Sequence, residues 1–182
     1  ESKTFCPFPF MNLNSNTDGS VKICCAQNEN IHLKKEDGTT YNLYEDDIED
    51  VWNSTHIKDI RKKLLNGEQI KECNVCWNVE NADKSYGGHD APTSTRLDSI
   101  KSYMEEDGIF SYHRQFIENN VLSTLGDGWV EESLKSLELR LGNHCNLACN
   151  MCWGYSSSKI NTERLNLLKS RDVDMPDWLF EM

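Results

Sequence analysis

The sequence has no long hydrophobic run. No apolar stretch approaches the roughly 20 residues that a helix needs to cross a membrane. The first residues also lack the basic, apolar and small-residue regions of a secretory signal peptide. These two absences exclude a membrane-spanning helix and predict a cytoplasmic protein.

Positive charge is scarce. Lysine and arginine total 19 against 30 aspartate and glutamate residues, and the formal net charge is −11. Nonspecific binding to nucleic acids depends on neutralising phosphates with lysine and arginine. The composition therefore gives no support for a nucleic-acid partner.

Cysteine, in contrast, is plentiful. The chain has eight cysteines, which fall into one group of three and one group of five. Disulfide pairs are expected in a secreted chain, whereas this odd grouping is typical of metal or cluster binding in a reducing compartment. The first group is Cys145, Cys149 and Cys152, and the second is Cys6, Cys24, Cys25, Cys73 and Cys76.

The three-cysteine group has the spacing CxxxCxxC and follows a strand-like segment. Three thiolates on one short loop can each hold one iron of a [4Fe–4S] cube, which leaves the fourth iron open to a small molecule. The alternative is a structural zinc site completed by His144. Structural zinc usually takes its ligands as two separated pairs, so a single loop favours the cluster.

This run resembles the cluster motif of the radical S-adenosylmethionine (SAM) enzymes. The resemblance implies that Cys145, Cys149 and Cys152 bind a [4Fe–4S] cluster whose open iron takes the amino and carboxylate groups of SAM. One electron would then cleave SAM reductively to methionine and a 5′-deoxyadenosyl radical. The family usually has an aromatic residue just before the third cysteine, where this chain has Met151, with Trp153 on the other side. Either side chain could shield the cluster or lie near the adenine.

The larger group has its own pattern. Twelve residues separate Cys6 from Gly19, four more separate Gly19 from Cys24, and Cys73 and Cys76 form a CxxC pair. The pattern resembles the auxiliary-cluster module called the SPASM or twitch domain. That module usually follows the radical SAM barrel, but here it comes first, as in the N-terminal twitch-like segments of some radical SAM proteins.

The second resemblance implies an auxiliary [4Fe–4S] cluster. Its tasks would be electron relay or holding the module together. A four-cysteine zinc knuckle is the alternative, because this ligand set also forms zinc sites. The implied ligands are Cys6, Cys24, Cys73 and Cys76.

A hairpin is predicted between Cys6 and Cys25. Strands over 10–15 and 20–25 can pair around the turn 16–19, because Asp-Gly supplies the positive φ of a tight turn. The turn would bring Cys6 towards Cys24. Alternation puts Cys24 and Cys25 on opposite faces, so only one can join the cluster. We expect Cys24 to be the ligand and Cys25 to be a buried thiol.

Further elements follow the hairpin. A second hairpin turns at 36–39, a short helix is expected over 46–52, and Thr55 could cap a helix over 56–65 that Gly67 ends. The apolar stripe on the longer helix indicates core packing. Cys73 and Cys76 are spaced as at a helix start, with Trp77 as a lid.

The later segments are predicted as follows. Residues 86–92 read as a loop and module boundary, and 99–119 as two helical pieces broken near 107–108. A turn is expected at 126–128. Residues 134–141 alternate as the first strand of a barrel would, and Ser156, Ser157 and Ser158 can cap a helix that runs to Lys169.

The predicted fold is α/β. Residues 1–88 form an α+β module of small β-hairpins and helices, 89–133 form a helical connector, and 134–182 begin a partial (β/α)6 radical SAM barrel. A barrel needs on the order of 200 residues. Because few residues follow Cys145 and the chain begins with Glu1, we expect a fragment that is not active alone.

The resemblance implies a radical SAM enzyme that modifies a peptide or protein. Its electron donor would be a flavodoxin or ferredoxin. The alternative function is a noncatalytic interaction module that binds zinc or an iron–sulfur cluster. The two hypotheses predict different colours, since iron–sulfur clusters make a protein brown whereas zinc leaves it colourless.

Overall fold

The computed structural model describes residues 3–82, 93–105, 113–124, 126–131, 133–145, 147, 149, 152 and 157–170. The chain divides into two units, Glu1–Leu139 and Arg140–Met182. In the described residues, the first unit holds a small sheet and several helices, and the second holds helix α6 and the three cysteines of the CxxxCxxC motif. This mixed architecture confirms the predicted α/β class.

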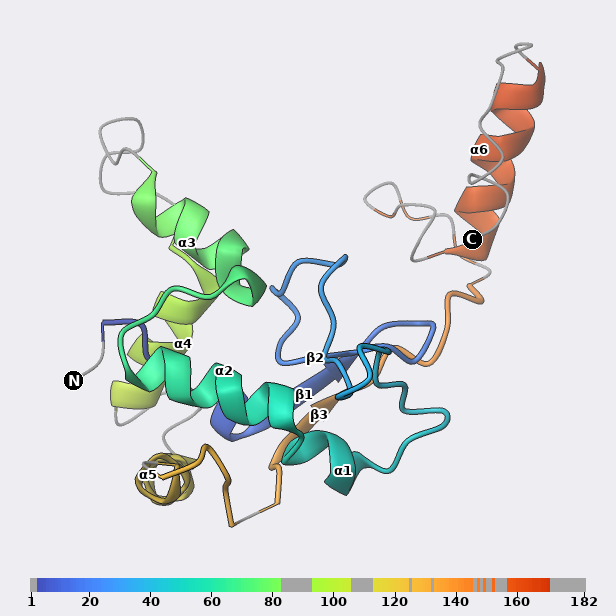
Figure 1. Ribbon diagram of the computed structural model, residues 1–182. Helices are drawn as coiled ribbons and strands as arrows, with labels where there is room; N and C mark the ends of the chain where they lie inside the picture. Colours follow the sequence, from blue (N-terminus) through green and yellow to red (C-terminus); the bar gives the residue numbers. More distant parts are fainter. Residues whose placement is uncertain are drawn as a thin grey trace. The chain divides into compact units, whose positions relative to one another are not determined.

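The sheet has three strands in the order β2-β1-β3 (Figure 1). Strand β1 (Asn12–Ser15) pairs antiparallel with β2 (Val21–Lys22), with Ser15 opposite Val21. Gly19 takes a φ of 85° in the connecting turn, as the Asp-Gly signal predicts. The first hairpin is therefore confirmed, but β2 ends at Lys22, well before the predicted end at residue 25.

Strand β3 (Ser136–Glu138) pairs parallel with β1, with Leu137 opposite Leu13. The segment 134–141 was predicted to begin a barrel, but β3 is an edge strand of the same sheet as the hairpin. No further strand follows it in the described part of the chain. Alternating leucines identify a strand, but they do not specify its partner.

The second hairpin is a turn with isolated bridges. Gly38 has a φ of 87°, and the Lys35 N–H donates to the Thr39 carbonyl at 2.8 Å. Lys34 and Thr40 form the single antiparallel bridge beside this turn. The predicted turn at 36–39 is confirmed, without the regular strands expected on either side.

Helices α1 (Ile48–Trp52) and α2 (Thr55–Leu65) lie close to the predicted ranges. The cap of α2 is Ser54 rather than Thr55, because the Ser54 hydroxyl accepts the Ile57 N–H at 3.4 Å. The stripe of apolar residues on α2 is buried in the core, as predicted. The other helical elements of this unit are η1 (Phe8–Phe10), η2 (Lys71–Cys73), α3 (Asn74–Asn81), α4 (Thr95–Met104) and α5 (Arg114–Ser123).

A buried arginine joins several of these elements. Arg61 on α2 is fully buried and donates hydrogen bonds to carbonyl oxygens of Pro9, Trp52 and Gly128 at 2.8, 2.8 and 3.2 Å. Burial lowers the pKa of Arg61 to about 9, so its guanidinium still carries a charge at neutral pH. The side chain thus fastens η1 and the turn at Gly128 to the helices.

The second unit contains helix α6 (Ser158–Ser170). The Ser157 hydroxyl accepts the Ile160 N–H at 3.4 Å, so Ser157 caps the helix as predicted. None of the described helices is long and apolar enough to cross a membrane. Several predicted features lie outside the described residues: the loop 86–92, the break at 107–108, Met151, Trp153 and Ser156.

Candidate metal centre

Four cysteines from three separate segments line one small cavity, called here the four-cysteine cavity. All four side chains are buried, with exposed fractions between 5% and 8%. They are Cys6, Cys24, Cys73 and Cys76. The structure thus brings together every cysteine that the sequence predicts for the auxiliary site.

Local structure explains how the cysteines converge. Cys6 immediately precedes the turn Pro7–Phe10, and Cys24 begins a turn in which its carbonyl accepts the Gln27 N–H at 3.3 Å. Cys73 ends η2 and is the N-cap of α3, and Cys76 lies in the first turn of that helix. The CxxC pair therefore sits at a helix start, as predicted.

Cys25 does not enter the cavity. It was predicted to be a buried thiol on the face opposite Cys24, but its side chain is exposed. The prediction is wrong because β2 ends at Lys22, so strand alternation no longer governs the side chains at residues 24 and 25.

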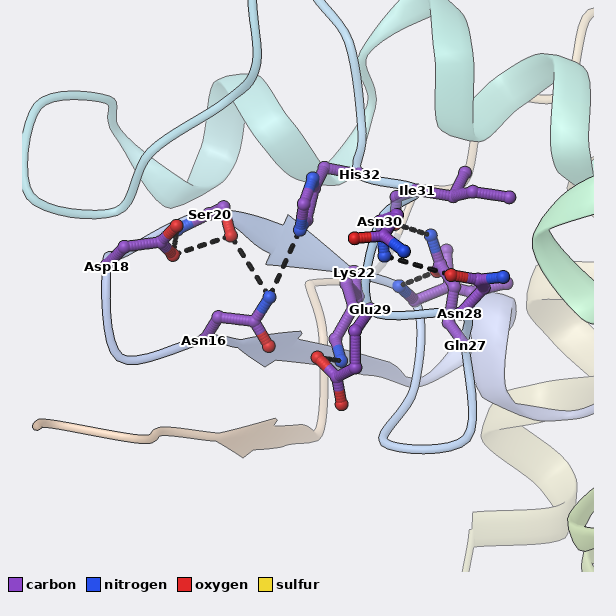
Figure 2. Close-up of polar contacts among 11 residues, drawn as sticks. Asn16, Asp18, Ser20, Lys22, Gln27, Asn28, Glu29, Asn30, Ile31 and His32 are labelled. Atoms are coloured by element: carbon purple, nitrogen blue, oxygen red, sulfur yellow. Dashed lines mark hydrogen bonds and ion pairs between the residues drawn. The ribbon is translucent and has the colours of Figure 1, made fainter. Parts of the chain in front are cut away.

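Gln27 holds the segment that carries Cys24 through two hydrogen bonds. Figure 2 shows Gln27 in the loop that leads to Ile31. Its amide oxygen accepts the Ile23 N–H at 2.8 Å, and its amide nitrogen donates to the Ile31 carbonyl at 2.6 Å. The side chain is buried and lines the four-cysteine cavity. Gln27 was not predicted from the sequence, because its role depends on the loop conformation.

Trp77 was predicted as a lid. Its ring is buried, and its indole N–H donates to the Ile70 carbonyl at 2.9 Å. It is not among the residues that line the four-cysteine cavity. Trp77 therefore packs behind the CxxC pair and stabilises the start of α3.

The electrostatics of the cavity favour neutral thiols until a cation enters. Burial raises the pKa of Cys6 to about 12, although the Phe8 N–H and the Ser99 hydroxyl offset part of this rise. Burial also raises the pKa of Cys73, and negative charge on Cys6 or Cys24 raises it further. Four thiolates this close need a positive counter-charge, which is what a metal centre provides.

The donor set is that of a fully ligated iron–sulfur cube, in which each thiolate binds a different iron. The same four-cysteine set also forms structural zinc sites.

Residues 6–77 match the SPASM iron–sulfur cluster-binding domain. The matched segment runs from the first cavity cysteine to the residue after the last. It confirms the predicted SPASM module and indicates iron–sulfur binding by this part of the chain. Comparisons with curated proteins and with solved structures gave no match.

One side of the four-cysteine cavity comes from outside the SPASM segment. Thr95 and Arg96, in the first turn of α4, line it together with the cysteines. The Arg96 guanidinium pairs with Glu80 of α3, and both side chains are largely buried. Neither residue was predicted from the sequence, since no spacing rule connects them to the cysteine pattern.

The CxxxCxxC loop lies in the second unit, at the start of α6. Cys145 and Cys152 are half-buried and Cys149 is exposed. The Cys145 N–H donates to the Ser158 hydroxyl at 3.4 Å, and the Cys152 N–H donates to the Cys149 carbonyl at 3.0 Å. The first of these hydrogen bonds joins Cys145 to the first residue of α6.

His144 was the predicted fourth ligand of the zinc alternative. Its side chain is exposed. Within the described ranges, it belongs to no group of side chains that could hold a metal ion.

Proposed function

We propose that this chain is the cluster-binding part of a radical SAM enzyme. The observation that carries the proposal is the convergence of four buried cysteines on one cavity within the segment that matches the SPASM domain. SPASM domains occur in radical SAM enzymes, so the CxxxCxxC loop in the same chain has a coherent role.

The four-cysteine cavity would hold the auxiliary [4Fe–4S] cluster, with all four irons bound by protein. Such a cluster supplies one-electron transfer when it is bound. The chain contributes a site lined by buried side chains, among them the four thiols and Gln27. Buried side chains around a cluster would limit its contact with water and so influence its reduction potential.

The CxxxCxxC loop would hold the second [4Fe–4S] cluster. Its three cysteines are more accessible than those of the four-cysteine cavity, and Cys149 is exposed. Accessibility suits a site that must admit SAM to an open iron. There, one electron would break a carbon–sulfur bond of SAM and give methionine and a 5′-deoxyadenosyl radical.

The proposed substrate is a peptide or protein, and the proposed electron donor is a flavodoxin or ferredoxin. A noncatalytic iron–sulfur module is the second candidate. It is favoured by the extent of the family match, which ends at residue 77 and does not include the CxxxCxxC loop. The two candidates differ in whether the protein responds to SAM.

Electron paramagnetic resonance distinguishes them. The protein is reconstituted anaerobically with iron and sulfide, reduced, and measured with and without SAM. We expect SAM to change one signal in the wild type, and to change none when Cys145, Cys149 and Cys152 are replaced by alanine.

The matched control is Cys25→Ala, since this thiol is exposed and does not line the cavity. It should leave both signals and the response to SAM intact. If SAM changes no signal in a wild-type protein that carries both clusters, the enzyme proposal is wrong and the noncatalytic module is favoured.

A further inference from the structure

We propose that Arg96 and Glu80, which form a buried ion pair, shift the reduction potential of the cluster in the four-cysteine cavity in opposite directions and balance each other. The inference rests on the proposed function, because it assumes that an iron–sulfur cluster binds there. Arg96 lies outside the segment that matches the SPASM domain. Glu80 also lies outside this segment, so both members of the pair belong to the chain that follows the domain.

The backbone of α4 approaches the cysteines directly. Ser94 caps the helix by accepting the Leu97 N–H at 3.1 Å. The N–H of Arg96 has no partner within the helix at this position, and it faces Cys76 closely enough to lower the pKa of that thiol against the effect of burial. A donor to a cluster sulfur stabilises the more negative, reduced state.

The guanidinium of Arg96 connects the two chain segments that carry Cys6 and Cys76. Its Nε and Nη2 donate to the two carboxylate oxygens of Glu80 at 2.9 and 2.5 Å. Its Nη1 donates to the carbonyl of Phe5, next to Cys6, at 2.8 Å. The group also lies 4.8 Å from the ring centre of Trp77. Arg96 is thus fixed in place beside the cavity.

Both charges act on the cysteines from a buried position. The exposed fractions of the Arg96 and Glu80 side chains are only 7% and 13%. Burial raises the pKa of Cys76; the Glu80 carboxylate adds to this rise, and the Arg96 charge opposes it. The Arg96 charge also opposes the rise at Cys6. The two members of the pair therefore have opposite effects on negative charge in the cavity.

Reduction adds one electron, and hence one negative charge, to the cluster. Arg96 stabilises that added charge, whereas Glu80 destabilises it, and in the intact pair the two effects largely cancel. Because solvent screens buried charges only weakly, removing one member leaves the other uncompensated. The reduction potential should then move in opposite directions in the two single variants.

The test measures the midpoint potential by a dithionite titration followed by electron paramagnetic resonance. The full chain carries Cys145→Ala, Cys149→Ala and Cys152→Ala, so that only the auxiliary cluster contributes. Arg96→Gln should lower the potential, and Glu80→Gln should raise it. We expect each to change the one-electron equilibrium about tenfold, which corresponds to about 59 mV.

Two further variants complete the design. The double variant Arg96→Gln/Glu80→Gln should restore the potential close to its starting value. Lys101→Gln is the matched control, because Lys101 belongs to the same helix and pairs with Glu105, but both side chains are exposed. It should leave the potential unchanged.

A purely structural role for the pair would shift both single variants in the same direction. That result would overturn this inference and leave the proposed function standing. Unchanged reduction potentials in variants that keep four irons would do the same. If Arg96→Gln loses its iron, two other variants test the inference. The reduction potential should rise in Glu80→Gln and should shift only slightly in Arg96→Lys, which keeps the positive charge. A starting protein that takes up zinc and no iron would overturn the proposed function together with this inference.

Discussion

At the scale of single residues, the four-cysteine cavity is lined by two kinds of side chain. The cysteines belong to a sequence motif, whereas Gln27 and Arg96 reach the cavity only through the folded structure. Cys6, Cys24, Cys73 and Cys76 were predictable because their pattern resembles that of the SPASM domain. Gln27 and Arg96 could not be predicted from the sequence. Gln27 bonds to the backbone of its own loop, and Arg96 bonds to Glu80 and to the distant Phe5 carbonyl. Cys25 was predicted wrongly, since the sequence does not show where β2 ends.

Gln27 provides a test at this scale. Gln27→Ala leaves the Ile23 N–H and the Ile31 carbonyl without their buried partner. We expect the free energy of unfolding of the metal-free protein to fall by about 2 kcal/mol, as measured by urea denaturation. Asn30→Ala, in the same loop but exposed, should have little effect. Equal effects of the two substitutions would contradict the role of Gln27.

At the scale of elements, local signals predicted local structure. The Asp-Gly turn, the capped helix α2 and the CxxC helix start all follow from neighbouring residues. The pairing of β3 with β1 joins residues more than a hundred positions apart, and no local signal specifies it. Leu137 and Leu139 remain partly exposed on and beside that edge strand.

The turn at Gly128 tests how the later chain packs on α2. Gly128 has a φ of 90°, and an added Cβ would lie 2.3 Å from the Lys58 carbonyl oxygen. Gly128→Ala should therefore lower the free energy of unfolding by about 3 kcal/mol, as measured by urea denaturation.

The matched control lies two residues earlier in the same turn. A Cβ added at Gly126 meets no atom within 4 Å, and this residue has no positive φ in the left-handed range. Gly126→Ala should change the free energy of unfolding by about 0.5 kcal/mol or less. A Gly128→Ala protein as stable as Gly126→Ala would show that this turn does not pack on α2.

At the scale of the whole molecule, the metal-free protein should become less stable in alkali. Burial raises the pKa of Cys6 to about 12 and also raises those of Cys24, Cys73 and Cys76. In the unfolded chain, thiols lose their protons near pH 8.5. Above that pH the folded state binds more protons, so the free energy of unfolding falls as pH rises.

Urea denaturation at pH 7.5 and pH 10 measures this loss. Each buried thiol contributes up to about 1.4 kcal/mol per pH unit, and Cys24→Ala should make the fall shallower. Below about pH 8 the contribution is complete and stability should be flat with respect to these groups. A stability that does not decline between pH 7.5 and pH 10 would contradict the burial of neutral thiols.

The most direct test of the central claim is the iron and sulfide content of the reconstituted chain. With two cubes the wild type should bind about eight irons, and Cys24→Ala should bind about four fewer. Cys25→Ala should keep the full content, because its thiol does not line the four-cysteine cavity. Zinc in place of iron, or loss of iron in Cys25→Ala but not in Cys24→Ala, would contradict the assignment of the four-cysteine cavity as an iron–sulfur site.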